Sequence, residues 1–132
     1  MRVRRLALAG AVTLAGLGTA LSTAGTANAA ESCTSGYACL YYNSNYSGAF
    51  YRQYFNISNY ANYYFSASAS GSAGAGLPVK NNVASVDNWD FYNGIRMYYN
   101  SGYSGASQPI GAGGQANLNT TLKNENASGK FY

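Results

Sequence analysis

The residues whose types and spacing come nearest to a catalytic pair are two carboxylates beside the single tryptophan. Asp87 and Asp90 flank Trp89, and two such carboxylates across one cleft could hydrolyse a sugar. Residues three apart on a strand, however, point to opposite faces of a sheet. The sequence also contains no histidine, which excludes Ser-His-Asp triads, histidine-based zinc sites and imidazole bases. We therefore predict that the chain is not an enzyme.

The N-terminus has the pattern of a secretory signal peptide. Arginines begin the chain, an apolar run follows, and residues 27–29 form an A-x-A cleavage signal. Thr, Ser and Gly residues interrupt the apolar run, so it is too weak for a membrane anchor. We expect residues 1–29 to be removed and residues 30–132 to form one extracellular domain without a membrane span.

The positive charge of the chain lies largely in this N-terminal segment. The formal net charge is +4, and the Lys and Arg residues beyond the segment are scattered along the sequence. Binding to nucleic-acid phosphates requires clustered positive side chains. We expect no nucleic-acid partner.

The chain has 2 cysteines, Cys33 and Cys39. In an exported chain such a close pair is far more often a disulfide than a metal or redox site, and the C-x-x-C spacing of thioredoxin-like proteins is absent. A ring of this size restrains the unfolded state by roughly 2 kcal/mol. We expect it to hold the new N-terminus against the first strand.

The elements that must position these residues arise from a duplication. Residues 41–49 return almost unchanged as residues 98–106. Each copy has an aromatic residue, a second aromatic residue and then a glycine, at Tyr41, Tyr46 and Gly48 and at Tyr98, Tyr103 and Gly105. This spacing fits neither a helical face nor a plain alternating strand. It predicts a folded-over β-hairpin turn in each copy.

Tyrosine dominates the composition, with 14 residues. Asn, Ser and Gly fill the spaces between the tyrosines, and this mixture favours strands and turns. Consecutive tyrosines place one ring on each face of a sheet, so we expect about half of the rings to face solvent. An exposed ring could stack on a sugar or contact another partner, whereas an inward ring packs in the core.

The two copies differ in length. Segments 81–86 and 124–129 correspond, and they lie near the ends of copies that span about 33–90 and about 94–132. The first copy is longer because it contains a Ser/Ala/Gly-rich stretch, residues 66–77. Small residues bury too little area to offset the entropy of ordering, so we expect a flexible insertion there.

The opening motif and the closing Asn/Asp-Asn/Asp-x-x-Ser segment together resemble the Greek-key motif of βγ-crystallins. The resemblance covers nearly all of residues 30–132. It implies an all-β, βγ-crystallin-like sandwich of two Greek-key motifs. In that family the glycine lets the hairpin fold back so that the first aromatic ring lies over it.

The chain is also similar to the bacterial secreted family typified by the Streptomyces metalloproteinase inhibitor. The similarity rests on Cys33, Gly36, Tyr37, Cys39, Leu40 and Tyr41, on residues 46–49 and on residues 81–86. It implies a monomeric inhibitor that blocks a peptidase with a rigid loop. In that family a second disulfide braces the reactive bond. No cysteine follows Cys39 here, so no reactive-site residue carries over.

The longest loop, residues 56–78, is the candidate inhibitory loop. Tyr64, Phe65 and Leu77 give it large apolar side chains of the kind that thermolysin-like clefts accept. Two alternatives stay open at this point. The chain could be a module that binds glycans or the cell envelope through exposed tyrosines, or an antimicrobial protein resembling the killer-toxin-like members of the same fold.

Microbial βγ-crystallins bind calcium through oxygens of the closing segment. By motif match the side-chain candidates are Asn82, Ser85, Glu125 and Ser128. Val86 and Gly129 stand where a second serine is usual, and Glu125 alone among the candidates is charged. We expect weak calcium binding and no required cofactor, with turn capping by Asn and Ser as the competing role.

Overall fold

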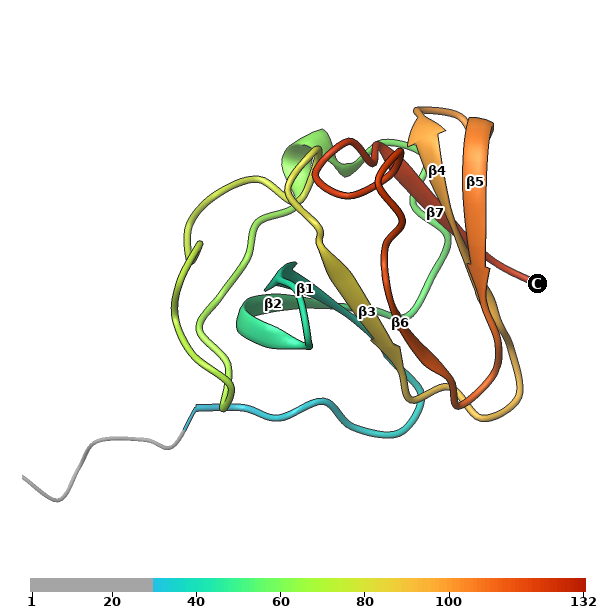
Figure 1. The fold of residues 1–132 in the computed structure, drawn as a ribbon. Coiled ribbons are helices and arrows are strands. Elements are labelled where there is room, and N and C mark those ends of the chain that lie inside the picture. The colour runs from blue at the N-terminus through green and yellow to red at the C-terminus, as the bar shows by residue number, and fades with distance from the viewer. Residues whose placement is uncertain (1–29) are drawn as a thin grey trace, which may run out of the picture.

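The computed structural model describes residues 30–132, and the expected signal segment, residues 1–29, lies outside the described residues. Two antiparallel sheets enclose the core (Figure 1). The elements are β1 (Ala38–Asn43), β2 (Ser47–Gln53), the 3₁₀ turn η1 (Tyr60–Asn62), β3 (Ser85–Asn88), β4 (Ile95–Asn100), β5 (Ser104–Ile110), β6 (Gln115–Asn117) and β7 (Ser128–Phe131). Between residues 30 and 132, no helix has the length and apolarity that a bilayer crossing requires.

Each half of the chain builds most of one sheet and contributes one segment to the other. The first sheet has the order β2-β1-β3-β6, so β6 from the second half pairs with β3 from the first. The second sheet has the order β5-β4-β7, and Ile57 from the first half bridges Gly129 of β7. This reciprocal exchange confirms the predicted all-β sandwich of two Greek-key motifs.

The duplicated motif folds as two matching hairpins. The β1–β2 register shifts between Tyr41 and Asn43, and the β4–β5 register shifts at the equivalent place, between Tyr98 and Asn100. The shift lets each hairpin fold over, as the spacing of the aromatic residues predicts.

The glycine of each hairpin is required by the backbone. Gly48 and Gly105 have φ angles of 87° and 82°, which side-chain-bearing residues rarely adopt. The atoms nearest to a Cβ at Gly48 are the Ala73 carbonyl oxygen and the Asn43 amide, and at Gly105 they are those of the Asn100 amide. The first ring of each copy packs edge-on against the second ring, with centroids 6.5 and 6.0 Å apart.

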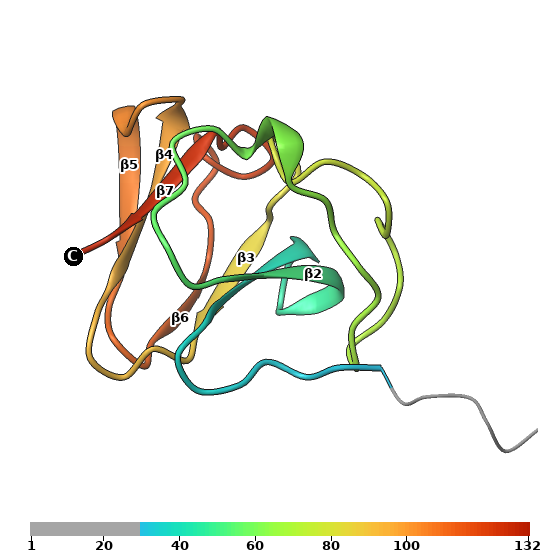
Figure 2. The ribbon, with the colours of Figure 1, turned by 180° about the vertical axis from the view of Figure 1, so that it is seen from behind.

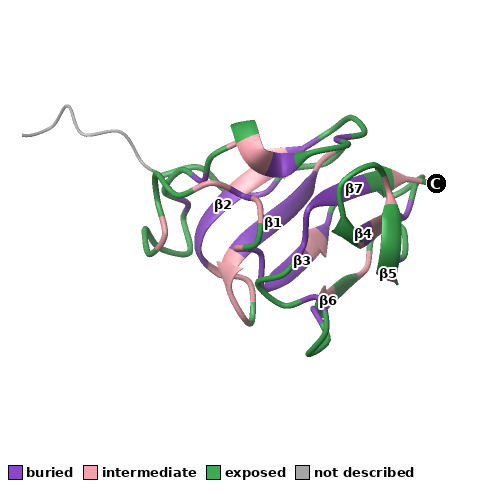
Figure 3. Cartoon of the chain, turned by 90° about the horizontal axis from the view of Figure 1, so that it is seen from above, coloured by how far each residue is buried: buried purple, intermediate pink, exposed green. Residues whose placement is uncertain are grey.

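Alternate residues of β1 serve two separate hydrophobic clusters. Ala38 and Leu40 face the main core between the sheets, whereas Cys39 and Tyr41 pack on the outer face of the first sheet. Most residues of β1, β2 and β3 are buried, and Figure 3 shows these strands in purple. Full burial of a side chain as large as Leu stabilises the fold by about 1.5–3 kcal/mol.

The Ser/Ala/Gly-rich insertion, residues 66–77, lies along the outer edge of β2 (Figure 2). Phe50 and Ser66 exchange two backbone hydrogen bonds of 2.9 and 3.0 Å, and the Ala49 N–H donates to the Ala73 carbonyl at 2.9 Å. The insertion is therefore attached to the sheet rather than hanging free. Composition did not predict this attachment, because backbone hydrogen bonds need no large side chains.

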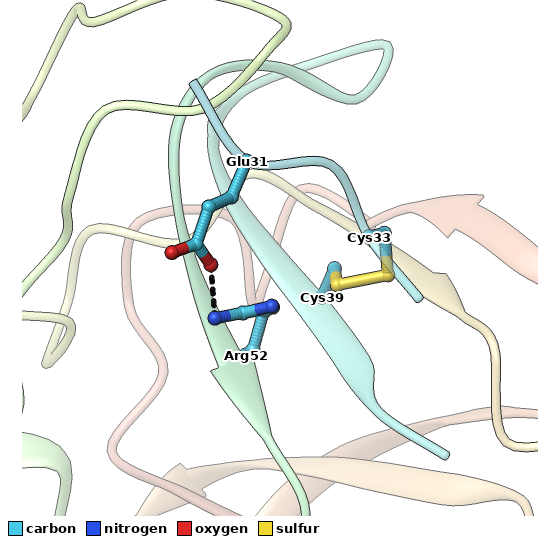
Figure 4. Close-up of polar contacts among 4 residues, drawn as sticks. All are labelled: Glu31, Cys33, Cys39 and Arg52. Carbon is cyan, nitrogen blue, oxygen red and sulfur yellow. Dashed lines mark ion pairs between the residues drawn. A yellow bond between two sulfur atoms is a disulfide. The ribbon is translucent and has the colours of Figure 1, made fainter. Parts of the chain in front are cut away.

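The expected disulfide joins Cys33 to Cys39, with Cα atoms 6.0 Å apart. Glu31 forms an ion pair with Arg52 of β2 beside it (Figure 4). The Glu31 carbonyl also accepts a hydrogen bond of 2.7 Å from the Ala69 N–H of the insertion. The first described residues are thus tied to β1, to β2 and to the insertion.

Candidate functional site

The candidate inhibitory loop contains an extended segment centred on Tyr64. The Val79 N–H donates to the Tyr63 carbonyl at 2.8 Å, and the Phe65 N–H donates to the Leu77 carbonyl at 3.0 Å. These bonds hold both neighbours of Tyr64 to residues 77–79, where the chain runs back alongside them. Tyr64 itself sits between them in an antiparallel bridge.

The two neighbours of Tyr64 are also anchored by their rings. Tyr63 packs edge-on against Tyr51 of β2, and Phe65 packs edge-on against Tyr42 of β1, with centroids 5.5 and 5.9 Å apart. Burial, with smaller effects from neighbouring tyrosines, raises the pKa of Tyr51 to about 12. Its hydroxyl therefore stays protonated, and the support beneath the loop is uncharged.

The three residues expected to contact a peptidase differ in exposure. Tyr64 is 55% exposed and Leu77 is 42% exposed, whereas Phe65 is only 3% exposed. Successive side chains of an extended segment point in opposite directions. Because the Tyr64 side chain points to solvent, the Phe65 side chain points into the core. This corrects the prediction for Phe65, which is not available to a partner. Tyr64 and Leu77 form the exposed apolar part of the loop.

The serines proposed as calcium ligands hold the two hairpins. The Ser85 hydroxyl donates to the Asn43 carbonyl at 2.6 Å and accepts from the Tyr46 N–H at 2.9 Å. Ser128 makes the matching bonds in the second hairpin, at 2.6 and 3.1 Å. Both hydroxyls are therefore used in the turn-capping role.

Asn82 and Glu125 line two separate pockets that the duplication places in equivalent positions. The first pocket has a volume of about 530 Å³ and contains Asn82 and Lys123. The second has a volume of about 300 Å³ and contains Glu125 and Lys80. The structure therefore distributes the four calcium candidates between two pockets and two hairpins.

The residues of these pockets do not fit a tight calcium site. The first pocket has no carboxylate, and its candidate Asn82 offers only a neutral amide oxygen, which alone holds calcium weakly. The second has Glu125 alone, and each pocket is also lined by a lysine, whose ammonium group disfavours a second cation. Among residues 30–132 there is no cluster of His, Cys, Asp and Glu that could hold a metal.

The aspartates that flank Trp89 have separate surroundings. The Asp87 carboxylate accepts a hydrogen bond of 2.9 Å from the Trp89 indole N–H. The Asp90 carboxylate accepts from the Tyr92 and Asn93 N–H groups, both at 2.9 Å, and so caps the following turn. Asp87 lines a shallow pocket with Trp89, and Asp90 does not.

Among the other residues that line this shallow pocket, sequence reasoning missed Phe91 and Gln115. Gln115 reaches it because β6 pairs with β3, so that Gln115 lies directly opposite Asp87. An exposed aromatic residue close to Trp89 was the one local signal that could have identified Phe91. The pairing of Gln115 with Asp87 joins two segments far apart in the sequence, so no local sequence pattern indicates it.

Comparison with known proteins supports the fold. No family model matches the sequence, and no curated protein matches it. A solved structure described as "Evolution of the eye lens beta-gamma-crystallin domain fold" matches with a TM-score of 0.61 and 14% sequence identity. The match covers 80% of this chain and 93% of that chain. At this identity the likeness concerns the fold alone.

Proposed function

From the βγ-crystallin domain fold of the chain, we propose a secreted peptidase inhibitor that presents Tyr64 and Leu77 to the cleft of a metallopeptidase. The observation that carries the proposal is Tyr64 itself. It is an exposed aromatic residue at the centre of an extended backbone whose neighbours are fixed. The fold alone does not choose a function, so the argument rests on this segment.

A braced loop loses less conformational entropy on binding than a free one, and each immobilised side chain would otherwise cost about 0.5–1.5 kcal/mol. Tyr63 and Phe65 are already held by hydrogen bonds and by ring packing. Peptidase clefts bind extended backbone, which adds to the enzyme as a further strand. Tyr64 is therefore displayed in the conformation that such a cleft accepts.

The side chains of the exposed pair suit an apolar specificity pocket. Tyr64 and Leu77 are both large and exposed, and the backbones around them are hydrogen-bonded to one another. Thermolysin-like metallopeptidases accept large apolar side chains, so they are the first class to test. Export from the cell is part of the proposal, and the disulfide of Cys33 and Cys39 supports it.

Titration of thermolysin with purified residues 30–132 tests this function. We expect stoichiometric loss of activity, and we expect Tyr64→Ala to weaken inhibition by at least about tenfold, as for a residue at the centre of an interface. Leu77→Ala should weaken it by a smaller factor. Tyr92→Ala is the matched control, because Tyr92 is an aromatic residue that is 93% exposed on a different loop.

Unchanged thermolysin activity at excess protein would reject the proposal for this peptidase class. Cleavage of the protein at residues 63–66, detected by mass spectrometry and accompanied by recovery of activity, would identify a substrate instead of an inhibitor. Equal inhibition by the parent protein and Tyr64→Ala would show that a different surface is responsible. Serine peptidases in the same assay would define the class more narrowly.

A further inference from the structure

The shallow pocket beside Trp89 has the composition of a ligand site and takes no part in the proposed inhibition. It has a volume of about 310 Å³, at the lower end of the range for small-molecule sites. Asp87 and Gln115 line it with polar groups, and Trp89 and Phe91 line it with aromatic rings. Its residues include Asp87 and Asn88 at the end of β3, and Figure 1 shows this end of β3 away from the loop, residues 56–78, that carries Tyr64.

Sheet geometry brings the pocket residues to one side. Asp87 on β3 and Gln115 on β6 are directly opposite each other in the antiparallel register, so their side chains project from the same face. Trp89 follows Asp87 by two positions. Its N–H donates to the Tyr37 carbonyl at 2.9 Å and so continues the backbone pairing of β3 with β1. It therefore projects from that face as well.

The aromatic rings are held in place before any ligand arrives. The Trp89 indole donates to Asp87, and the Phe91 ring packs edge-on against it with a centroid distance of 6.1 Å. Phe91 also lies on Gly113, where a Cβ would come within 2.9 Å of the ring. Trp89 is 40% exposed and Phe91 is 57% exposed, so both rings keep a free surface.

The loop that carries these rings is braced by its own polar groups. The Asn88 side chain donates to the Asn93 carbonyl at 2.9 Å and to the Gly111 carbonyl at 3.1 Å. The Gly113 N–H donates to the Asp90 carbonyl at 2.9 Å. These bonds tie the loop after β3 to the loop before β6, so the pocket is largely preformed. A preformed site binds with a smaller entropic penalty.

Hydrogen-bonding capacity remains beside the rings. One Asp87 oxygen accepts from Trp89, and within residues 30–132 the other Asp87 oxygen and the Gln115 amide have no hydrogen-bond partner. Asp87 is also the charged residue that lines the pocket. A ligand here meets an apolar platform, a carboxylate acceptor, and an amide that both donates and accepts.

We propose that this pocket binds a neutral sugar ring of a polysaccharide. The C–H face of a pyranose packs on the Trp89 ring, as apolar groups pack on aromatic faces, and the Phe91 ring, inclined to Trp89 by 62°, flanks the sugar. Adjacent hydroxyls of the ring donate to the free Asp87 oxygen and pair with the Gln115 amide, and the bonds to the carboxylate are the stronger ones. The carboxylate repels uronic and sulfated sugars, so neutral chains are the ligand class.

The single tryptophan of the chain makes binding directly measurable, because all indole fluorescence comes from Trp89. Purified residues 30–132 are titrated with a soluble neutral β-glucan, a galactomannan and neutral chito-oligosaccharides, and with alginate and heparin as anionic chains. Retardation in gels that contain the same glycans gives a second readout. We expect a saturable fluorescence change and retardation with at least one neutral glycan, and neither with the anionic chains.

Variants separate the pocket from the rest of the surface. We expect Gln115→Ala and Phe91→Ala to weaken binding by about tenfold each, since one lost hydrogen bond or contact is worth roughly 1–1.5 kcal/mol. Asp87→Asn should weaken it similarly and reduce discrimination against alginate. Trp89→Phe keeps a ring and should retain weak binding. Tyr64→Ala should bind glycan as the parent does, which keeps this test independent of peptidase inhibition.

The absence of any change with all neutral glycans would overturn the proposal. Binding that is unaffected by both Gln115→Ala and Phe91→Ala would place the glycan elsewhere on the protein and would equally overturn it. Preference for alginate or heparin would contradict the role of Asp87. Failure of the thermolysin titration would leave this inference standing, because no residue is shared by the two sites.

Discussion

The hydroxyl group of Tyr60 lies against the backbone of Gly129 so closely that no Cβ fits at position 129. The hydroxyl donates to the Gln53 side-chain oxygen at 2.6 Å, and the Gln53 amide nitrogen donates to the Gly129 carbonyl at 3.0 Å. All three residues are buried. The contact joins η1 of the first half to β7 of the second.

Gly129→Ala should therefore destabilise the fold. The new methyl group must displace the Tyr60 hydroxyl, and we expect the free energy of unfolding to fall by about 2–4 kcal/mol, measured by urea denaturation. Gly111→Ala is the control, because nothing lies within 4 Å of a Cβ at that glycine. It should change stability by no more than about 0.5 kcal/mol. Equal effects of the two substitutions would show that the close contact is not present in solution.

Stability should fall at alkaline pH because of Tyr60 and Tyr51. Burial first, and then neighbouring tyrosines, raise the pKa of Tyr60 well above its usual value and raise that of Tyr51 to about 12. Unfolded tyrosines ionise near pH 10, so their contribution to stability is fully present below about pH 10 and is lost as pH rises towards the folded pKa. Thermal midpoints measured from neutral to alkaline pH should show this decline.

Tyr60→Phe provides the comparison for the pH dependence. It removes one of the raised groups, so its midpoint should fall less steeply with pH above about 10, although it is less stable at neutral pH through loss of the Gln53 bond. Tyr92→Phe changes an exposed ring and should keep the parent slope. Parallel curves for the parent and Tyr60→Phe would contradict the assignment.

The hairpin serines should contribute to stability in equal measure. Ser85→Ala and Ser128→Ala each remove two part-buried hydrogen bonds, one to a carbonyl and one from an N–H, and we expect a loss of about 1–3 kcal/mol for each. The two serines share no partner, so the double variant should show the sum within about 0.5 kcal/mol. Ser72→Ala, at an exposed position, should be neutral in the same denaturation experiment. A neutral Ser85→Ala would remove the hairpin role.

Calcium should have little effect on this protein. We expect stabilisation below about 1 kcal/mol at millimolar calcium, because the two pockets contain one carboxylate and two lysines between them. Any effect should disappear in Glu125→Gln and persist in Asn82→Ala. Isothermal titration and thermal midpoints with and without chelator measure it. Micromolar affinity, or binding unchanged in Glu125→Gln, would show that the donor set is larger than the structure indicates.

The fold could be predicted because its signals are local and repeated. The spacing of Tyr41, Tyr46 and Gly48 encodes a turn in which the glycine needs a positive φ. The same spacing occurs a second time in the chain, so chance does not account for the pattern. The alternation of Tyr41 and Tyr42 between two clusters follows from the period of a strand. The disulfide followed from the number and spacing of the cysteines.

Other features depend on contacts between distant segments. The burial of Phe65 follows from the docking of its segment on β1 and β2, which no local pattern reveals. The pairing of residues 66–73 with β2 uses backbone groups, which composition does not report. Strand β6 is short and has no strong strand signal, so the meeting of Gln115 with Asp87 was also hidden.

The attachment of the insertion to β2 limits how copies of this protein can associate. A sandwich with two long open edges could add further molecules at both and grow into a filament. Here the insertion occupies one such edge at residues 48–50 of β2. Within residues 30–132 the other long edge strand is β5, which has no backbone neighbour on its outer side and carries Pro109. Edge pairing through β5 would bring two molecules together about a twofold axis, and the insertion would leave no second long edge fully open for a third molecule.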